Sequence, residues 1–99
     1  MKKTENTEPA ETRKLSAVMF TDIEGYTSLF GKDESKALSQ VEHHRQMLHD
    51  VAARYHGKII QFYGDGSVTT YPSVIEAVHA AIELQQQSSD AGISLLSGI

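Results

Sequence analysis

One helical pattern, residues 33–56, organises this sequence. Apolar or small side chains recur there at the i, i+4, i+7 spacing of a single helix face, at Ala37, Val41, His44, Leu48, Val51, Ala52 and Tyr55. Asp33 is a suitable N-cap residue, and Gly57 a suitable residue just past the helix end. The pattern therefore predicts a helix with one side towards a core.

Strand-like runs flank this helix. Residues 15–20 form a nearly continuous apolar run, which predicts a central strand covered on both faces. Residues 58–63 and 67–71 are rich in β-formers and enclose the turn Gly64-Asp65-Gly66, which predicts a hairpin.

The second half of the sequence repeats the alternation. Ser73 and Glu76 have the spacing of a capping box, and they open a predicted helix that runs to about Gln87. We expect its core face to contain Val74, Val78, Ala81, Ile82 and Gln85. Residues 93–99 begin another strand. The order β-α-β-β-α-β predicts an α+β, ferredoxin-like fold built on a split βαβ unit.

Composition limits the possible classes of protein. A chain of 99 residues is one small domain at most, and we assign residues 14–99 to it. Residues 1–13 are polar and charged, which predicts a disordered arm. The net charge of −4 argues against nucleic acid as a partner, and the absence of cysteine excludes disulfides and thiolate metal sites. No apolar run approaches the roughly 18 residues of a membrane span, and no secretory signal is evident, so we expect a cytoplasmic domain.

Two carboxylates occupy special positions. Asp22 ends the first predicted strand, and Asp65 lies in the hairpin turn. Because these elements can be neighbours in the predicted order, the two acids would repel unless a cation neutralised them. Mg²⁺ suits one or two carboxylates plus phosphate oxygens, and two ions about 4 Å apart would serve phosphoryl transfer. Residues 23–27, with Gly25 permitting close approach, could present backbone N–H groups to a polyphosphate.

Ordinary structural explanations compete with this hypothesis. An aspartate after a strand is commonly a turn former or helix cap, and Gly-Asp-Gly is a common hairpin turn. Strand alternation would place Gln61 beside Ile59 and Tyr63, on the side of the acids. His44 belongs to the apolar helix stripe, and we expect Arg45 on the solvated face. On spacing alone, a metal site and an ordinary turn both remain possible.

Longer segments resemble a known family. The stretches KLSAVMFTDIEGYTSLF, HGKIIQFYGDGSVTTYPS and AVHAAIELQ, within residues 13–87, resemble the bacterial class III adenylyl/guanylyl cyclase catalytic domain. The motifs Phe-Thr-Asp-Ile-x-Gly-Tyr-Thr and Gly-Asp-Gly, in this order, are more specific together than either is alone. The resemblance implies the ferredoxin-like palm of these cyclases. It also implies a lyase that converts ATP or GTP to a 3′,5′-cyclic nucleotide and pyrophosphate in intracellular signalling.

The resemblance also assigns roles to residues. It implies that Asp22 and Asp65 are catalytic and hold two Mg²⁺ or Mn²⁺ ions, with the Ile23 carbonyl as a further ligand. The backbone that would bind the triphosphate belongs to Ile23, Glu24, Gly25, Tyr26 and Thr27. It implies a homodimer in the complete protein.

Two departures from the family pattern matter. Gln61 stands where adenylyl cyclases usually have a purine-reading lysine and guanylyl cyclases a glutamate, and a side-chain amide pairs with either purine. A second base-reading residue, and the asparagine and arginine for the transition state, are expected beyond SLLSGI. We therefore expect the N-terminal portion of a cyclase domain, with its C-terminal part missing, to be inactive alone. The alternative is a non-catalytic nucleotide-binding or dimerisation module on the same fold.

Overall fold

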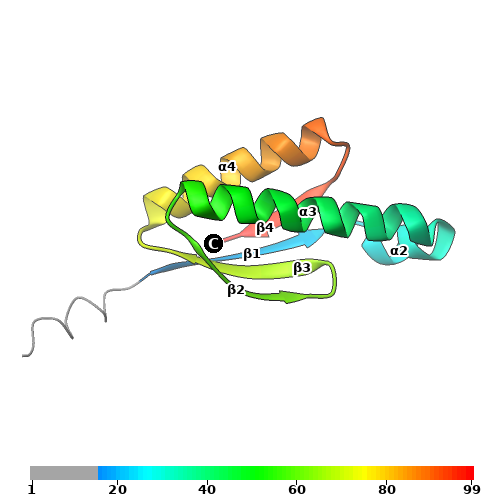
Figure 1. The fold of residues 1–99 in the computed structure, drawn as a ribbon, viewed down its shortest axis with the longest axis horizontal. Coiled ribbons are helices and arrows are strands. Elements are labelled where there is room, and N and C mark those ends of the chain that lie inside the picture. The colour runs from blue at the N-terminus through cyan, green and yellow to red at the C-terminus, as the bar shows by residue number, and fades with distance from the viewer. Residues whose placement is uncertain (1–15) are drawn as a thin grey trace, which may run out of the picture.

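The computed structural model describes residues 16–99 (Figure 1). The arm predicted for residues 1–13 lies outside this range. The helices and strands are, in chain order, β1 (Ala17–Ile23), α2 (Tyr26–Lys32), α3 (Glu34–Arg54), β2 (Lys58–Tyr63), β3 (Gly66–Tyr71), α4 (Val74–Asp90) and β4 (Leu95–Gly98). None of the helices in residues 16–99 combines the length and apolar character needed to cross a membrane.

The four strands form one antiparallel sheet in the order β2-β3-β1-β4. Helices α3 and α4 lie together over one face of this sheet, and the short α2 lies beside the N-terminal end of α3 (Figure 1). This confirms the predicted α+β, ferredoxin-like arrangement. Because β1 pairs with β3, the C-terminal end of β1 lies next to the β2–β3 turn.

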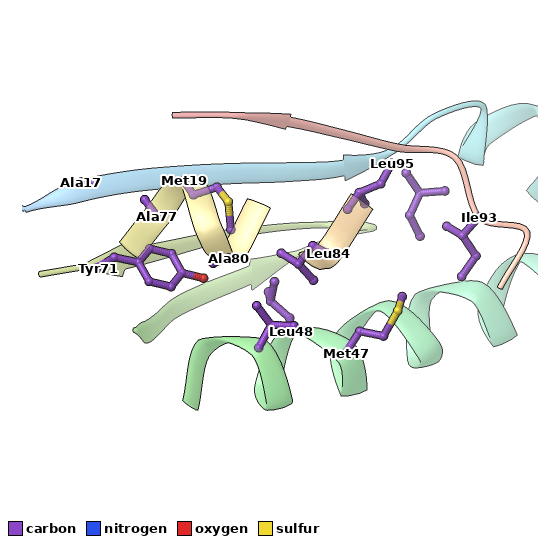
Figure 2. Close-up of a cluster of buried hydrophobic side chains, with 12 residues drawn as sticks. Ala17, Met19, Met47, Leu48, Tyr71, Ala77, Ala80, Leu84, Ile93 and Leu95 are labelled. Atoms are coloured by element: carbon purple, nitrogen blue, oxygen red, sulfur yellow. The ribbon is translucent and has the colours of Figure 1, made fainter. Parts of the chain in front are cut away.

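The core lies between the helices and the covered face of the sheet (Figure 2). Met19 from β1 and Tyr71 from β3 belong to one cluster with buried side chains of both long helices. The fully covered members of the cluster include Met19, Leu48, Val51, Ala77, Ala80 and Leu84.

The prediction that β1 is covered on both faces is wrong. Its residues alternate strictly between buried and exposed, and Phe20 is 52% exposed. Both long helices lie on the same face, so Val18 and Phe20 lie on the other face, with no helix of residues 16–99 above them. A continuous apolar run thus reflects one core-facing set of side chains and a second apolar set on the open face.

The predicted core face of α4 is also wrong. Ile82 is 60% exposed, and the helix instead buries a stripe of mostly small side chains, Ala77, Ala80, Leu84 and Ser88. Alanines let the helix backbone approach β1 and β3 closely, whereas the larger Val74 and Ile82 face outward. The sequence-based prediction placed the larger side chains in the core because they are the more hydrophobic. Close packing against the sheet instead favours the smaller side chains.

The helix ends agree only in part with those predicted from the sequence. Asp33 caps α3 by accepting from the Lys36 N–H, and Ser73 caps α4 by accepting from the Glu76 N–H, as predicted. At the end of α3, however, His56 adopts the left-handed φ of 63°, and Gly57 is needed for space. A Cβ at Gly57 would lie 2.4 Å from the Tyr71 ring.

Two features of the chain are absent from the sequence-based prediction. Helix α2 was not expected, since its seven residues bury none of their side chains and include a glycine. Helix α4 continues to Asp90, past the expected end at Gln87.

Strand β2 contains a register shift between Ile59 and Gln61. Ile59 pairs with the buried Thr69, but Gln61 pairs with Val68, so Ile59 and Gln61 lie on opposite faces. The predicted alternation of Ile59, Gln61 and Tyr63 on one face is therefore wrong. Such bulges increase strand twist and blunt an exposed sheet edge.

Candidate functional site

The two acids singled out in the sequence converge at the C-terminal end of β1. The Ile23 N–H donates to Asp22 Oδ1 and to Asp65 Oδ2, at 3.1 Å in each case. Asp22 is the last residue but one of β1, and Asp65 lies in the short turn between β2 and β3. The adjacency of β1 and β3 brings them together.

The electrostatics of the pair are unfavourable without a positive charge. The pKa of Asp22 is raised above its usual 3.8, chiefly by sharing a hydrogen bond with the Asp65 carboxyl, and further by desolvation and the charge of Asp65. The hydrogen bond from the Ile23 N–H acts in the opposite direction. A single amide dipole therefore does not offset the repulsion, and a proton or a cation would.

Glycine at position 66 permits this close approach of hairpin and strand. A Cβ there would lie 2.7 Å from the Thr21 carbonyl oxygen and 2.9 Å from the Tyr63 ring. Because a backbone carbonyl cannot move aside as a flexible side chain can, any larger residue would push the hairpin away from β1. The second glycine of Gly-Asp-Gly thus fixes where Asp65 lies.

A shallow depression adjoins Asp22 on the open face of the sheet. It measures about 260 Å³, and its lining comes from β1, the end of β2 and β4: Phe20, Thr21, Asp22, Tyr63, Leu96, Ser97 and Gly98. Its walls combine aromatic and aliphatic side chains with one carboxylate. Such a lining suits a ligand that has a flat apolar part and a charged part near a cation.

Gln61 lies on this open face. It pairs with Val68, which pairs with Phe20, and residues directly opposite one another share a face of the sheet. Phe20 and Asp22 are two residues apart on β1 and so share that face as well. The predicted placement of Gln61 on the side of the acids therefore agrees with the structure, although the alternation used to reach it does not. Its purine-reading role stays a prediction.

The turn between β1 and α2 uses some of its N–H groups internally. The Ile23 N–H binds the two carboxylates, and the Glu24 N–H donates to the Ser94 carbonyl at 2.8 Å. Gly25 adopts φ 74° and precedes α2, so the N–H groups of Gly25, Tyr26 and Thr27 have no carbonyl partner within the helix. Of the five amides predicted to hold a triphosphate, these three are the available ones.

Three polar side chains behind the acids have no role that the sequence alone predicts. Thr21, Ser67 and His44 are buried on the covered face, and the Thr21 hydroxyl is hydrogen-bonded to both of the others. Arg45, expected on a solvated face, lies over the Phe62 ring at 4.8 Å instead. Two features of the sequence could have indicated this cluster. One is a histidine on the apolar stripe of α3, and the other is a hydroxyl residue close to each acid in sequence.

Comparison with known sequences gives one informative relative. The chain is 27% identical over 84 residues to "Putative adenylate cyclase 3" of Rhizobium meliloti (strain 1021). The match covers 84% of this chain and 14% of that protein. A scan against descriptions of known protein families finds no match.

Solved structures of adenylyl cyclases are also similar to this chain. Adenylate cyclases from Trypanosoma brucei in their monomeric state match with a TM-score of 0.67 and 27% identity, over 77% of this chain and 35% of theirs. This chain is similar in sequence and fold to adenylate cyclases. The fold also matches the adenylyl cyclase CyaB from P. aeruginosa, with a TM-score of 0.65 and 24% identity, over 82% of this chain and 52% of that one.

The cyclase relatives are longer than this chain. It spans about a seventh of the curated relative (14%) and 35–52% of the two structures above. The similarity therefore concerns only a part of each of those proteins.

The acid pair fits the divalent ions expected for cyclases, on the chemistry of its donors. Two converging carboxylates with a raised Asp22 pKa offer hard oxygen ligands and a deficit of positive charge. Within residues 16–99 no group of three or more His, Asp or Glu side chains is arranged to hold a metal. Any ion at Asp22 and Asp65 would complete its shell with backbone carbonyls, water or ligand phosphates, as Mg²⁺ commonly does.

Proposed function

We propose that this chain is the metal- and phosphate-binding part of a purine nucleotidyl cyclase, which forms a 3′,5′-cyclic nucleotide and pyrophosphate from ATP or GTP. The single observation that carries the proposal is the convergence of Asp22 and Asp65 on the Ile23 N–H. The relation to cyclase domains supports it.

In this proposal the chain's own residues bind and orient the nucleotide. Asp22 and Asp65 would hold two Mg²⁺ or Mn²⁺ ions, with the Ile23 carbonyl as a further ligand. Bound there, such ions lower the pKa of the ribose 3′-hydroxyl and neutralise charge on the transferred and leaving phosphates. The N–H groups of Gly25, Tyr26 and Thr27 would donate to the polyphosphate.

The open face would receive the rest of the nucleotide. The depression beside Asp22 presents Phe20, Tyr63 and Leu96, which suit a sugar and a flat base. Gln61 lies on the same face and carries both a donor and an acceptor, so it does not discriminate between adenine and guanine. The sequence resemblance implies that the complete protein works as a homodimer.

Calorimetric titration of the chain with Mn²⁺ and either ATP or GTP tests the binding step. We expect a nucleotide to bind only with Mn²⁺, and Asp22→Asn and Asp65→Asn each to abolish that binding. Asp50→Asn, which changes an exposed carboxylate on α3, is the matched control and should bind as the wild type does. Equal nucleotide binding by wild type and both acid variants would contradict the proposal.

Product formation tests the chemistry. We expect the 99-residue chain alone to form no appreciable cyclic nucleotide. Residues 16–99 can be grafted onto the matching segment of CyaB, whose fold covers 82% of this chain. Cyclic nucleotide production by the graft should be lost in Asp65→Asn, and its persistence there would count against a catalytic role for the pair.

A second function keeps the fold without the chemistry. Gln61, at the position where cyclases carry a charged purine-reading residue, favours a non-catalytic nucleotide-binding or dimerisation module. The same calorimetry identifies a dimerisation module, which binds neither nucleotide, and product formation by the graft separates a non-catalytic nucleotide-binding module from a cyclase.

A further inference from the structure

Three buried polar side chains lie directly behind the acid pair, on the covered face of the sheet. Thr21 Oγ1 lies 2.9 Å from His44 Nε2 and 2.5 Å from Ser67 Oγ. Each of the three residues is at most 1% exposed. Burying polar groups in a core is unfavourable unless they are paired, and apolar side chains would fill this space more simply. The cluster therefore calls for an explanation beyond packing.

The protonation state of His44 determines which atoms of the cluster donate hydrogen bonds. Burial lowers the pKa of His44 below its usual 6.5 and so favours the neutral ring, although the charge of Asp65 opposes this in part. A neutral imidazole has one N–H, and His44 Nδ1 has no partner among residues 16–99. The N–H therefore belongs on Nε2, where it donates to Thr21 Oγ1. The Thr21 hydroxyl can then donate to Ser67 Oγ.

Arg45, which follows His44 on α3, contacts the hairpin that carries Asp65. The Arg45 guanidinium lies over the Phe62 ring at 4.8 Å, and its Nη2 donates to the Gly64 carbonyl at 3.3 Å. Thr21 immediately precedes Asp22, and Gly64 immediately precedes Asp65. Two consecutive residues of one rigid helix thus hold the two residues that lead into the acids.

We propose that His44 and Arg45 are positioning residues for the acid pair. By holding Thr21 and Gly64, they fix the two carboxylates at the spacing at which both reach the Ile23 N–H and share divalent ions. The part of this inference that concerns ions rests on the proposed cyclase function, whereas the part that concerns carboxylate spacing does not.

The Ile23 amide reports on this spacing in the metal-free protein, because it donates to both carboxylates. Its hydrogen exchange can be compared with that of Leu84, a buried amide in the middle of α4 that reports global unfolding. In His44→Leu we expect Ile23 to exchange about tenfold faster relative to Leu84. In the same variant we expect the Mn²⁺ dissociation constant to rise about tenfold, as for other residues that orient metal ligands.

Three further variants make the test specific. His44→Gln keeps a donor near the place of Nε2 and should restore both values to within about threefold of wild type. Arg45→Met should raise Ile23 exchange through the hairpin alone, and it serves as the test if His44→Leu does not fold. His43→Leu makes the same change at an exposed site on α3 and should alter neither value.

The outcomes separate the two proposals. If Ile23 and Leu84 exchange rise by the same factor in His44→Leu and in Arg45→Met, these residues stabilise the fold only, and the positioning role is wrong. If wild type binds no Mn²⁺, the cyclase function is wrong, while the exchange ratio still decides the role of His44 and Arg45.

Discussion

Asp22 and Asp65 accept hydrogen bonds from the same backbone N–H, that of Ile23, at equal distances of 3.1 Å. The pKa of Asp22 is raised chiefly by the hydrogen bond it shares with the Asp65 carboxyl, then by burial and by the charge of Asp65, and the Ile23 N–H does not offset these effects. The metal-free site therefore works against folding at neutral pH.

Removing one charge of the pair should stabilise the metal-free protein. In Asp22→Asn the side-chain amide keeps an oxygen that accepts the Ile23 N–H, so the substitution deletes repulsion with little loss of bonding. We expect the melting temperature in the presence of a chelator to rise by about 3 °C. Calorimetric melting measures this, with Asp50→Asn as the exposed control. A lower melting temperature for Asp22→Asn would show that the pair is not repulsive.

The same pair predicts a pH trend. Because the native pKa of Asp22 lies above the unfolded value of 3.8, the native state binds more protons between the two values. The free energy of unfolding should therefore fall as pH rises through that window, and Asp22→Asn should flatten this decline. Denaturant melts across the acidic range measure it, and an unchanged decline in Asp22→Asn would assign the trend to other carboxyls.

His44 should make stability depend on pH in the opposite sense. Its native pKa lies below 6.5, so under mildly acidic conditions the unfolded state binds more protons. The free energy of unfolding should not depend on His44 above pH 6.5. It should fall as the pH drops below 6.5, by at most about 1.4 kcal/mol per pH unit. His44→Gln should lose this slope, and His43→Gln, at an exposed site, should retain it. An identical slope in both variants would show that His44 is not its source.

Gly66 should not tolerate a side chain. A Cβ would lie 2.7 Å from the Thr21 carbonyl oxygen, so we expect Gly66→Ala to destabilise the protein by about 1–3 kcal/mol. Gly31→Ala is the matched control, since a Cβ there meets nothing within 4 Å and α2 gains about 0.5–1 kcal/mol of helix preference. Urea unfolding of the two variants decides this. Equal stabilities would mean that β1 and the hairpin are not in close contact.

The face of α4 can be tested by two truncations on one helix. Leu84 is fully buried, so Leu84→Ala should destabilise by about 2–5 kcal/mol. Ile82 is 60% exposed, so Ile82→Ala should change stability by about 0.5 kcal/mol or less. Urea denaturation measures both. The reverse order of effects would restore the face expected from hydrophobicity.

The element order, apart from α2, could be predicted from sequence because each pattern had its own period and its own boundary signal. Asp33 and Ser73 opened their helices as predicted. The acid pair could be anticipated because strand order alone makes β1 and the hairpin neighbours.

The remaining features depend on how surfaces meet in three dimensions. The sequence pattern of α4 contains two apolar stripes, and only the approach to the sheet selects the one with Ala77 and Ala80. The bulge between Ile59 and Gln61 depends on the pairing with β3, not on local composition. His44 looked like an apolar-stripe residue because its hydrogen-bonded cluster, with Thr21 and Ser67, draws on distant strands.

The strict alternation along β1 gives the two faces of this strand different roles. Met19, Thr21 and Ile23 anchor it in the interior, while Val18, Phe20 and Asp22 form part of the surface that would meet a ligand. Substitutions at Val18 and Phe20 can therefore change recognition while the buried side of the strand stays unchanged. A laboratory evolution experiment confined to those positions would explore new specificities with little risk of unfolding the scaffold.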